Sequence, residues 1–139
     1  MKTINQYLSK FAITISILTI VFRYSLSSLL SNKEFVLVFI PAVLYFLSMF
    51  SAGWYFGKKD KEFLPIFDIG FRFHFVTYIV FTLISEMWFL MGFASKYENI
   101  KTVHITALIW GFLMIPHFIF YLMAKKNSIN NLDKSDLFE

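Results

Sequence analysis

Residues 74–93 read HFVTYIVFTLISEMWFLMGF, and in these twenty residues Glu86 is the only acidic side chain. A helix needs about 20 predominantly apolar residues to span the hydrocarbon core of a bilayer. A charge near the middle of such a helix costs on the order of 2.5–3.5 kcal/mol on insertion scales, unless it finds a partner. The stretch therefore predicts a membrane-spanning helix that makes a polar contact through Glu86.

The composition of the whole chain is that of a membrane protein. Of its 139 residues, 58% are hydrophobic and 19 are Phe, and the mean hydropathy is +0.63. A soluble domain of this length could not bury so much apolar surface. Cysteine is absent, which excludes disulfides, thiolate catalysis and Cys-ligated metals. We attribute the net charge of +4 to membrane topology, and expect no nucleic-acid partner.

Four apolar segments reach spanning length, so we predict an all-α membrane protein with four transmembrane helices. The loops between them are short, which favours an antiparallel bundle. We expect residues 1–126 to form the transmembrane domain and residues 127–139 to form a polar cytoplasmic tail. The predicted helices cover residues 11–31, 35–57, 71–95 and 103–123. The first segment is too long for a signal peptide and contains Arg23, so we expect it to be retained.

The lysines predict the orientation of the chain. Eight lysines lie near the N-terminus, the middle loop and the C-terminus, whereas Lys33, Lys96 and Lys101 lie in the other two loops. The positive-inside rule then places both termini and the middle loop in the cytoplasm. We expect an integral membrane protein, and favour the inner membrane of a bacterium.

Polar residues recur at helical spacing on three of the four predicted helices. Such stripes are expected to face other helices or a wet cavity rather than lipid. The stripes comprise Ser16, Thr19, Arg23 and Ser27 on the first helix, His74, Tyr78, Thr82, Ser85 and Glu86 on the third, and Thr106, Trp110, His117 and Tyr121 on the fourth. We predict a buried polar cluster composed of Arg23, Glu86, Thr82, Ser85, Tyr78 and Thr19.

Arg23 is the predicted partner of Glu86. Both residues lie roughly 12–14 Å below the same boundary at a rise of about 1.5 Å per residue, and opposite charges at matching depth offset each other's burial. Two alternatives are open for the pair: it fixes the helix register alone, or it belongs to a working site.

A second predicted cluster, Asp68, Arg72, His74, His117 and Tyr121, lies at the cytoplasmic end. Two facing histidines could bind haem or a metal, or pass protons. The alternative is structural: Asp68 caps a helix, Arg72 extends toward the headgroups, and each histidine is hydrogen-bonded within the bundle. Apart from this haem alternative, we expect no cofactor and no metal.

No motif specifies a reaction, so we favour a non-enzymatic protein without excluding an enzyme. The first hypothesis is a small membrane protein whose polar interior binds or conducts an ion, a proton or a small solute. The second is an accessory subunit of a larger membrane complex. The third is a b-type haem protein or other membrane enzyme that uses His74 and His117. The expected partners are the lipid bilayer and either further copies of the chain or the subunits of a larger complex.

Overall fold

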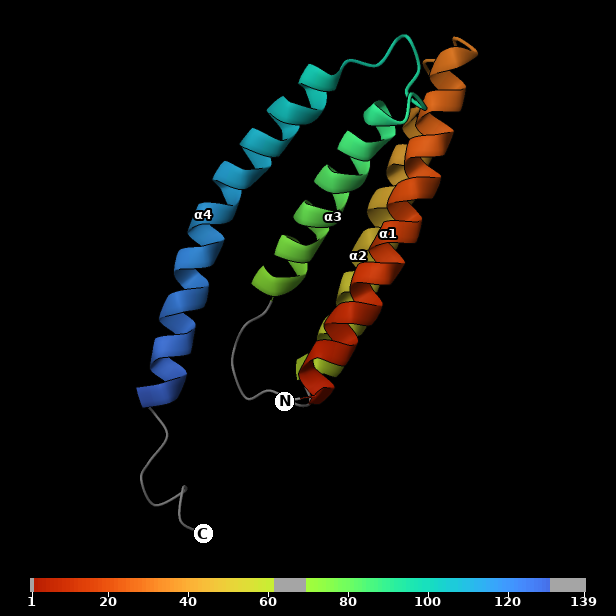
Figure 1. The fold of residues 1–139 in the computed structure, drawn as a ribbon. Helices are drawn as coiled ribbons and strands as arrows, with labels where there is room; N and C mark the ends of the chain where they lie inside the picture. The colour runs from red at the N-terminus through yellow and green to blue at the C-terminus, as the bar shows by residue number, and fades with distance from the viewer. Residues whose placement is uncertain (1, 62–69, 131–139) are drawn as a thin grey trace.

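The structure, a computed structural model, describes residues 2–61 and 70–130, which form four helices (Figure 1). Their bounds are Lys2–Ser31 for α1, Phe39–Lys61 for α2, Phe71–Leu90 for α3 and Ile100–Asn130 for α4. Each helix contains a stretch that is long and apolar enough to cross a membrane. The prediction of an all-helical chain with four potential spans is therefore confirmed.

Two helix boundaries differ from the prediction because the backbone turns within an apolar stretch. We predicted that the second helix begins at residue 35, but residues 32–38 form turns, with Lys33 at a φ of 63°. We predicted that the third helix ends at residue 95, but it ends at Leu90, and Gly92 follows with a φ of 73°. Gly adopts a positive φ at little cost, so it ends this helix before the apolar run is over.

The other two helices extend beyond their apolar segments. α1 begins at Lys2 rather than at residue 11, and α4 continues to Asn130 rather than ending at residue 123. The first residues of the predicted tail, 127–130, are therefore helical, while residues 131–139 lie outside the described residues. Hydropathy marks the apolar part of a helix, whereas backbone hydrogen bonding can continue into polar sequence.

α1 and α3 are the central helices of the fold. α1 packs against both α2 and α3, and α4 packs against α3. Consecutive helices run in opposite directions (Figure 1). We call the end that holds residues 32–38 and 91–99 the loop end, and the end where α1 begins and α4 ends the terminal end. Which end faces the cytoplasm is a prediction of the lysine distribution.

The apolar core lies between α1, α2 and α3. Phe11 and Ile15 of α1 are fully buried and pack with Phe73 of α3. The ring of Phe11 meets that of Phe73 edge-on at 4.9 Å between centroids, and that of Phe56 of α2 at 6.0 Å. Edge-to-face contacts of this kind contribute about 0.5–1.5 kcal/mol beyond the burial of area.

The buried side of α1 is polar toward the loop end. Thr19, Arg23 and Ser27 are all buried there. By contrast, the outward faces of α2 and α4 expose large apolar side chains, among them Phe39, Trp54, Leu108 and Phe112. A helix with a polar inner stripe and an apolar outer surface is suited to lipid as its solvent.

Candidate functional site

The polar side chains of α3 that contact α4 lie at three levels along the two helices. We call this contact the seam, and define it by Glu86, His104, Tyr78, Trp110, His74 and His117. These residues form three facing pairs, in the register of two antiparallel helices. The seam therefore contains a carboxylate, three imidazoles and a phenol along one helix–helix contact.

The first level of the seam, nearest the loop end, is an ion pair between helices. Nε2 of His104 lies 2.8 Å from Oε1 of Glu86. The two side chains retain 55% and 30% of their exposure, respectively, so the pair lies at the edge of the protein rather than in its core. It carries opposite charges only when the imidazole is protonated.

The second level is a close contact between Tyr78 and α4. The ring of Tyr78 meets that of Trp110 edge-on, with 5.8 Å between centroids. A Cβ atom added at Gly111 would lie 3.3 Å from the hydroxyl oxygen of Tyr78. Gly111 thus allows the phenol to approach the backbone of α4, as small residues do at helix contacts in membranes.

The third level, nearest the terminal end, brings two histidines together. The imidazoles of His74 and His117 lie 5.2 Å apart between centroids, with an angle of 47° between their planes. Phe71 and Tyr121, about one turn further along each helix, stack at 5.3 Å. The sequence placed both histidines in the predicted cytoplasmic cluster, and the structure brings their rings into contact.

The histidine pair does not have the geometry of a bis-histidine haem site. Axial imidazoles on opposite sides of one metal have nitrogens about 4 Å apart and ring centroids roughly 6 Å apart, with the macrocycle between them. The two rings are 5.2 Å apart and tilted, which leaves no room for a macrocycle between them.

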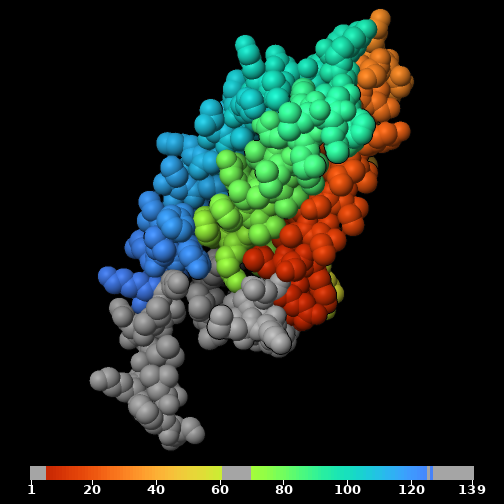
Figure 2. Space-filling model, in the orientation of Figure 1, coloured from red at the N-terminus to blue at the C-terminus, as the bar shows by residue number. Residues whose placement is uncertain are grey.

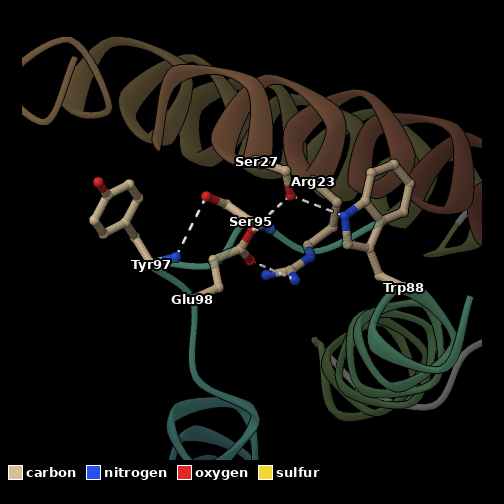
Figure 3. Close-up of polar contacts among 6 residues, drawn as sticks. All are labelled: Arg23, Ser27, Trp88, Ser95, Tyr97 and Glu98. Atoms are coloured by element: carbon tan, nitrogen blue, oxygen red, sulfur yellow. Dashed lines mark hydrogen bonds and ion pairs between the residues drawn. The ribbon is translucent and has the colours of Figure 1, made fainter. Parts of the chain in front are cut away.

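Arg23 does not pair with Glu86; that prediction was wrong. Nη2 of Arg23 lies 2.7 Å from Oε2 of Glu98, a residue of the loop between α3 and α4 (Figure 3). Both side chains are almost fully buried, at 5% and 6% exposure. Depth matching along the helices failed here because the loop folds back onto α1 and supplies the carboxylate itself.

Glu98 is the centre of a polar group that we call the loop cluster: Arg23, Ser27, Trp88, Ser95 and Glu98 (Figure 3). Oε1 of Glu98 accepts hydrogen bonds from the hydroxyl of Ser27 and from the backbone N–H of Ser95, the latter at 2.9 Å. The indole N–H of Trp88 donates to the hydroxyl oxygen of Ser27 at 2.9 Å. The loop cluster thus joins α1, α3 and the connecting loop.

The ion pair of the loop cluster is held mainly by charge. Nη2 and Oε2 are in contact, yet within the described residues neither atom has a well-aligned hydrogen bond, and Nε of Arg23 has none either. The guanidinium also lies over the ring of Phe89, 5.4 Å from its centroid. A buried cation gains from an aromatic face as well as from a carboxylate.

The sequence around Glu98 contains a local signal that hydropathy and helical periodicity do not detect. Ser95 and Glu98 have the S-x-x-E spacing of a capping box, in which the glutamate accepts from the backbone N–H of the serine. The structure contains that bond. Asn99 follows and accepts from the N–H of Lys101 at 3.0 Å, which caps the start of α4.

The structure does not bring the predicted buried polar cluster together; Arg23 belongs to the loop cluster, and the other members lie elsewhere. Thr19 faces α2, where its hydroxyl lies 3.0 Å from that of Tyr45. Glu86 and Tyr78 face α4 as part of the seam. Thr82 shares the i, i+4 stripe of the seam, and Ser85 is fully buried, its hydroxyl having no partner within the described residues.

Only some residues of the predicted cytoplasmic cluster lie together in the structure. His74, His117 and Tyr121 lie together along the seam. Arg72 forms an ion pair with Asp60, a buried residue of α2, so its side chain ties α3 to α2. Asp68 lies outside the described residues.

Comparison with known proteins gives no relative: no family model matches the chain, and neither the curated proteins nor the solved structures contain a match.

Proposed function

We propose that the chain is a small, non-enzymatic membrane protein that binds or conducts a proton or small cation along the seam. The observation that carries the proposal is the line of titratable side chains between α3 and α4. It begins at Glu86 and His104, passes Tyr78, and reaches His74 and His117. Chains of carboxylate and histidine side chains within a membrane are typical of proton relays.

The spacing of the seam suits stepwise transfer. His74, Tyr78, Thr82 and Glu86 follow one another at four residues, which places one hydroxyl, imidazole or carboxylate about every 6 Å along α3. The partners on α4 add a second imidazole at each end of the line, because His104 contacts Glu86 and His117 contacts His74. With the terminal end in the cytoplasm, as the lysines predict, the histidine pair would be the inner end of the route.

The loop cluster takes no direct part in this proposal. Arg23 and Glu98 are buried and engaged with each other, so they serve to hold the loop end closed. Glu86, in contrast, keeps 30% of its exposure and is accessible to an incoming ion. In this proposal Glu86 is the group that takes up the ion.

Flux into liposomes tests the proposal. Wild-type protein should acidify vesicles under an imposed proton gradient, as read from an enclosed pH-sensitive dye. Glu86→Gln keeps the shape of the side chain but removes the titrating group, and should reduce the flux at least tenfold. Glu34→Gln is the matched control, because Glu34 is exposed in the turn before α2, and it should leave the flux unchanged.

The second candidate function is an accessory subunit of a larger membrane complex. It is favoured by the most apolar 18 residues of α2, none of which is buried, and by the most apolar 18 residues of α4, of which 6% are buried. These two flanks of the molecule are available to other subunits or to further copies of the chain. If wild-type liposomes carry neither protons nor alkali cations, the conducting role fails and this second candidate replaces it.

A further inference from the structure

The two histidines at the terminal end of the seam have the separation of two ligands on one metal ion. A tetrahedral metal holds imidazole nitrogens at about 2.0–2.1 Å, which sets two such nitrogens about 3.3 Å apart. Each nitrogen lies about 1 Å from its ring centre, so two imidazoles that share one metal have centroids at roughly 4–5.5 Å. The centroids of His74 and His117 are 5.2 Å apart. We infer that His74 and His117 bind a divalent transition metal ion, with zinc and copper(II) preferred.

The surrounding structure holds the two rings in place. The backbone N–H of His74 donates to the carbonyl of Gly70 at 2.8 Å, at the first turn of α3. A Cβ atom at Gly70 would lie 3.6 Å from Cδ2 of His74, so the glycine backbone adjoins one side of the imidazole. The stacked pair Phe71 and Tyr121 fixes α3 against α4 beside the histidines. The ligands therefore come from two helices whose spacing is already set.

The site would bind its metal in an open, exchangeable form. No group of three or more His, Asp or Glu residues that could hold a metal occurs within residues 2–61 and 70–130. His74 and His117 thus supply two ligands, and water fills the remaining positions. Both side chains are exposed, so the metal can enter and leave without unfolding of the helices.

Imidazole ligands select the class of metal. Nitrogen ligands suit zinc, copper and nickel, whereas magnesium and calcium prefer oxygen ligands. The inference goes beyond the proposed function, because metal binding by the histidine pair requires no flux along the seam. Loss of proton flux and loss of metal binding are therefore separate outcomes.

Isothermal titration of the purified full chain with zinc tests the inference. The protein must carry no histidine tag and be held in detergent micelles. We expect one zinc per chain for the wild type, with no competition from magnesium. His74→Gln or His117→Gln should each weaken binding at least tenfold. His104→Gln is the matched control, because that histidine belongs to the other end of the seam, and its zinc affinity should equal that of the wild type.

A rescue variant separates a lost ligand from a damaged fold. His117→Cys supplies a thiolate, which is itself a zinc ligand, in a chain with no other cysteine. It should restore zinc binding to within a few-fold of the wild type. Wild-type affinity in both glutamine variants, an equal loss in His104→Gln, or no zinc binding by wild type would overturn the inference. Circular dichroism of each variant verifies that the helices are retained.

Discussion

Arg23 and Glu98 form a buried ion pair whose loss we expect to be costly. Both are nearly inaccessible, so each would be an isolated buried charge without the other. Removing one member of a buried pair costs about 3–5 kcal/mol, because the remaining charge is left uncompensated. An exposed pair such as Glu86 and His104 contributes about 0–1 kcal/mol.

The first prediction compares these two ion pairs. Glu98→Ala should lower the free energy of unfolding by about 3–5 kcal/mol, whereas Glu86→Ala should change it by about 1 kcal/mol or less. Thermal or denaturant unfolding in detergent micelles, followed by circular dichroism, measures both values.

A double variant identifies the partner. Arg23→Met combined with Glu98→Leu removes both charges and should recover most of the stability lost in the single variants. If instead Glu86→Leu rescues Arg23→Met and Glu98→Leu does not, Glu86 is the partner and the contact in the loop cluster is wrong.

At the level of residues, the sequence correctly predicted that Arg23 needs a carboxylate as its partner. It indicated Glu86, whereas the partner in the structure is Glu98. Periodicity shows on which face of its own helix a side chain lies. The distance of a side chain from the end of its helix can then be compared only with side chains on other helices. Neither method describes a loop that folds back to α1 and inserts Glu98 between α1 and α3 (Figure 3). The S-x-x-E pattern at Ser95 indicated a structured turn, although it did not indicate the contact with Arg23.

At the level of elements, the polar stripes marked the faces of the third and fourth helices that meet, but they did not identify the pairs of side chains in contact. His74 contacts His117, and Tyr78 contacts Trp110. A stripe with a period of four residues marks one face of a helix, whatever the environment of that helix. Helix ends were less predictable, because turns at residues 35–38 and at Gly92 interrupt sequences that remain apolar.

The second prediction concerns the close contact between α3 and α4. Gly111→Leu places a branched side chain where a Cβ atom alone would lie 3.3 Å from the Tyr78 hydroxyl, so either the Tyr78 ring or α4 itself must shift. We expect faster amide hydrogen exchange along α4 and a stability loss of about 1–3 kcal/mol, the usual cost of overpacking.

The matched control for this contact removes the side chain of Tyr78, which the leucine would otherwise meet. In a Tyr78→Ala background the same Gly111→Leu change meets no phenol, and its additional cost should fall below about 1 kcal/mol. An equal cost with and without the Tyr78 side chain would show that Gly111 does not face Tyr78.

At the level of the whole molecule, short connections predicted antiparallel neighbours but not their arrangement. α1 and α3 are central, and α4 contacts α3 (Figure 1). This arrangement depends on which helix faces fit together, including those of helices that are not neighbours in the sequence. In Figure 2, α3 lies between α1 and α4 on the visible face, and the residues that connect α3 to α4 fill the upper end. Hydropathy alone gives no order of helices around a core.

The third prediction concerns orientation in the membrane. The lysine distribution of eight to three predicts that the terminal end is cytoplasmic. Reporter domains fused at Glu139 and inserted between Lys96 and Lys101 should therefore report opposite sides, with Glu139 inside. A signal from outside the cytoplasm at Glu139 would reverse the orientation, and the same signal at both positions would contradict four spans.

The insertion into the loop needs a control for folding, since that loop carries Glu98. Labelling of single cysteines introduced at Lys33 and at Lys58 avoids any large insertion, because both side chains are outside the buried core. A membrane-impermeant thiol reagent added to intact cells should label the cysteine at position 33 and spare that at position 58.

The contact between α1 and the loop cluster also sets the order of events during synthesis. Ser27 and its acceptor Glu98 are separated by 71 residues, and Arg23 emerges still earlier than Ser27. At about 5–20 residues per second, the ribosome needs roughly 4–14 s to produce the carboxylate that neutralises this arginine. Throughout that interval the first helix carries an unpaired cation whose burial costs on the order of 2.5–3.5 kcal/mol. We therefore expect the first helix to be fully stable in lipid only after Glu98, in the loop that follows the third helix, has reached it.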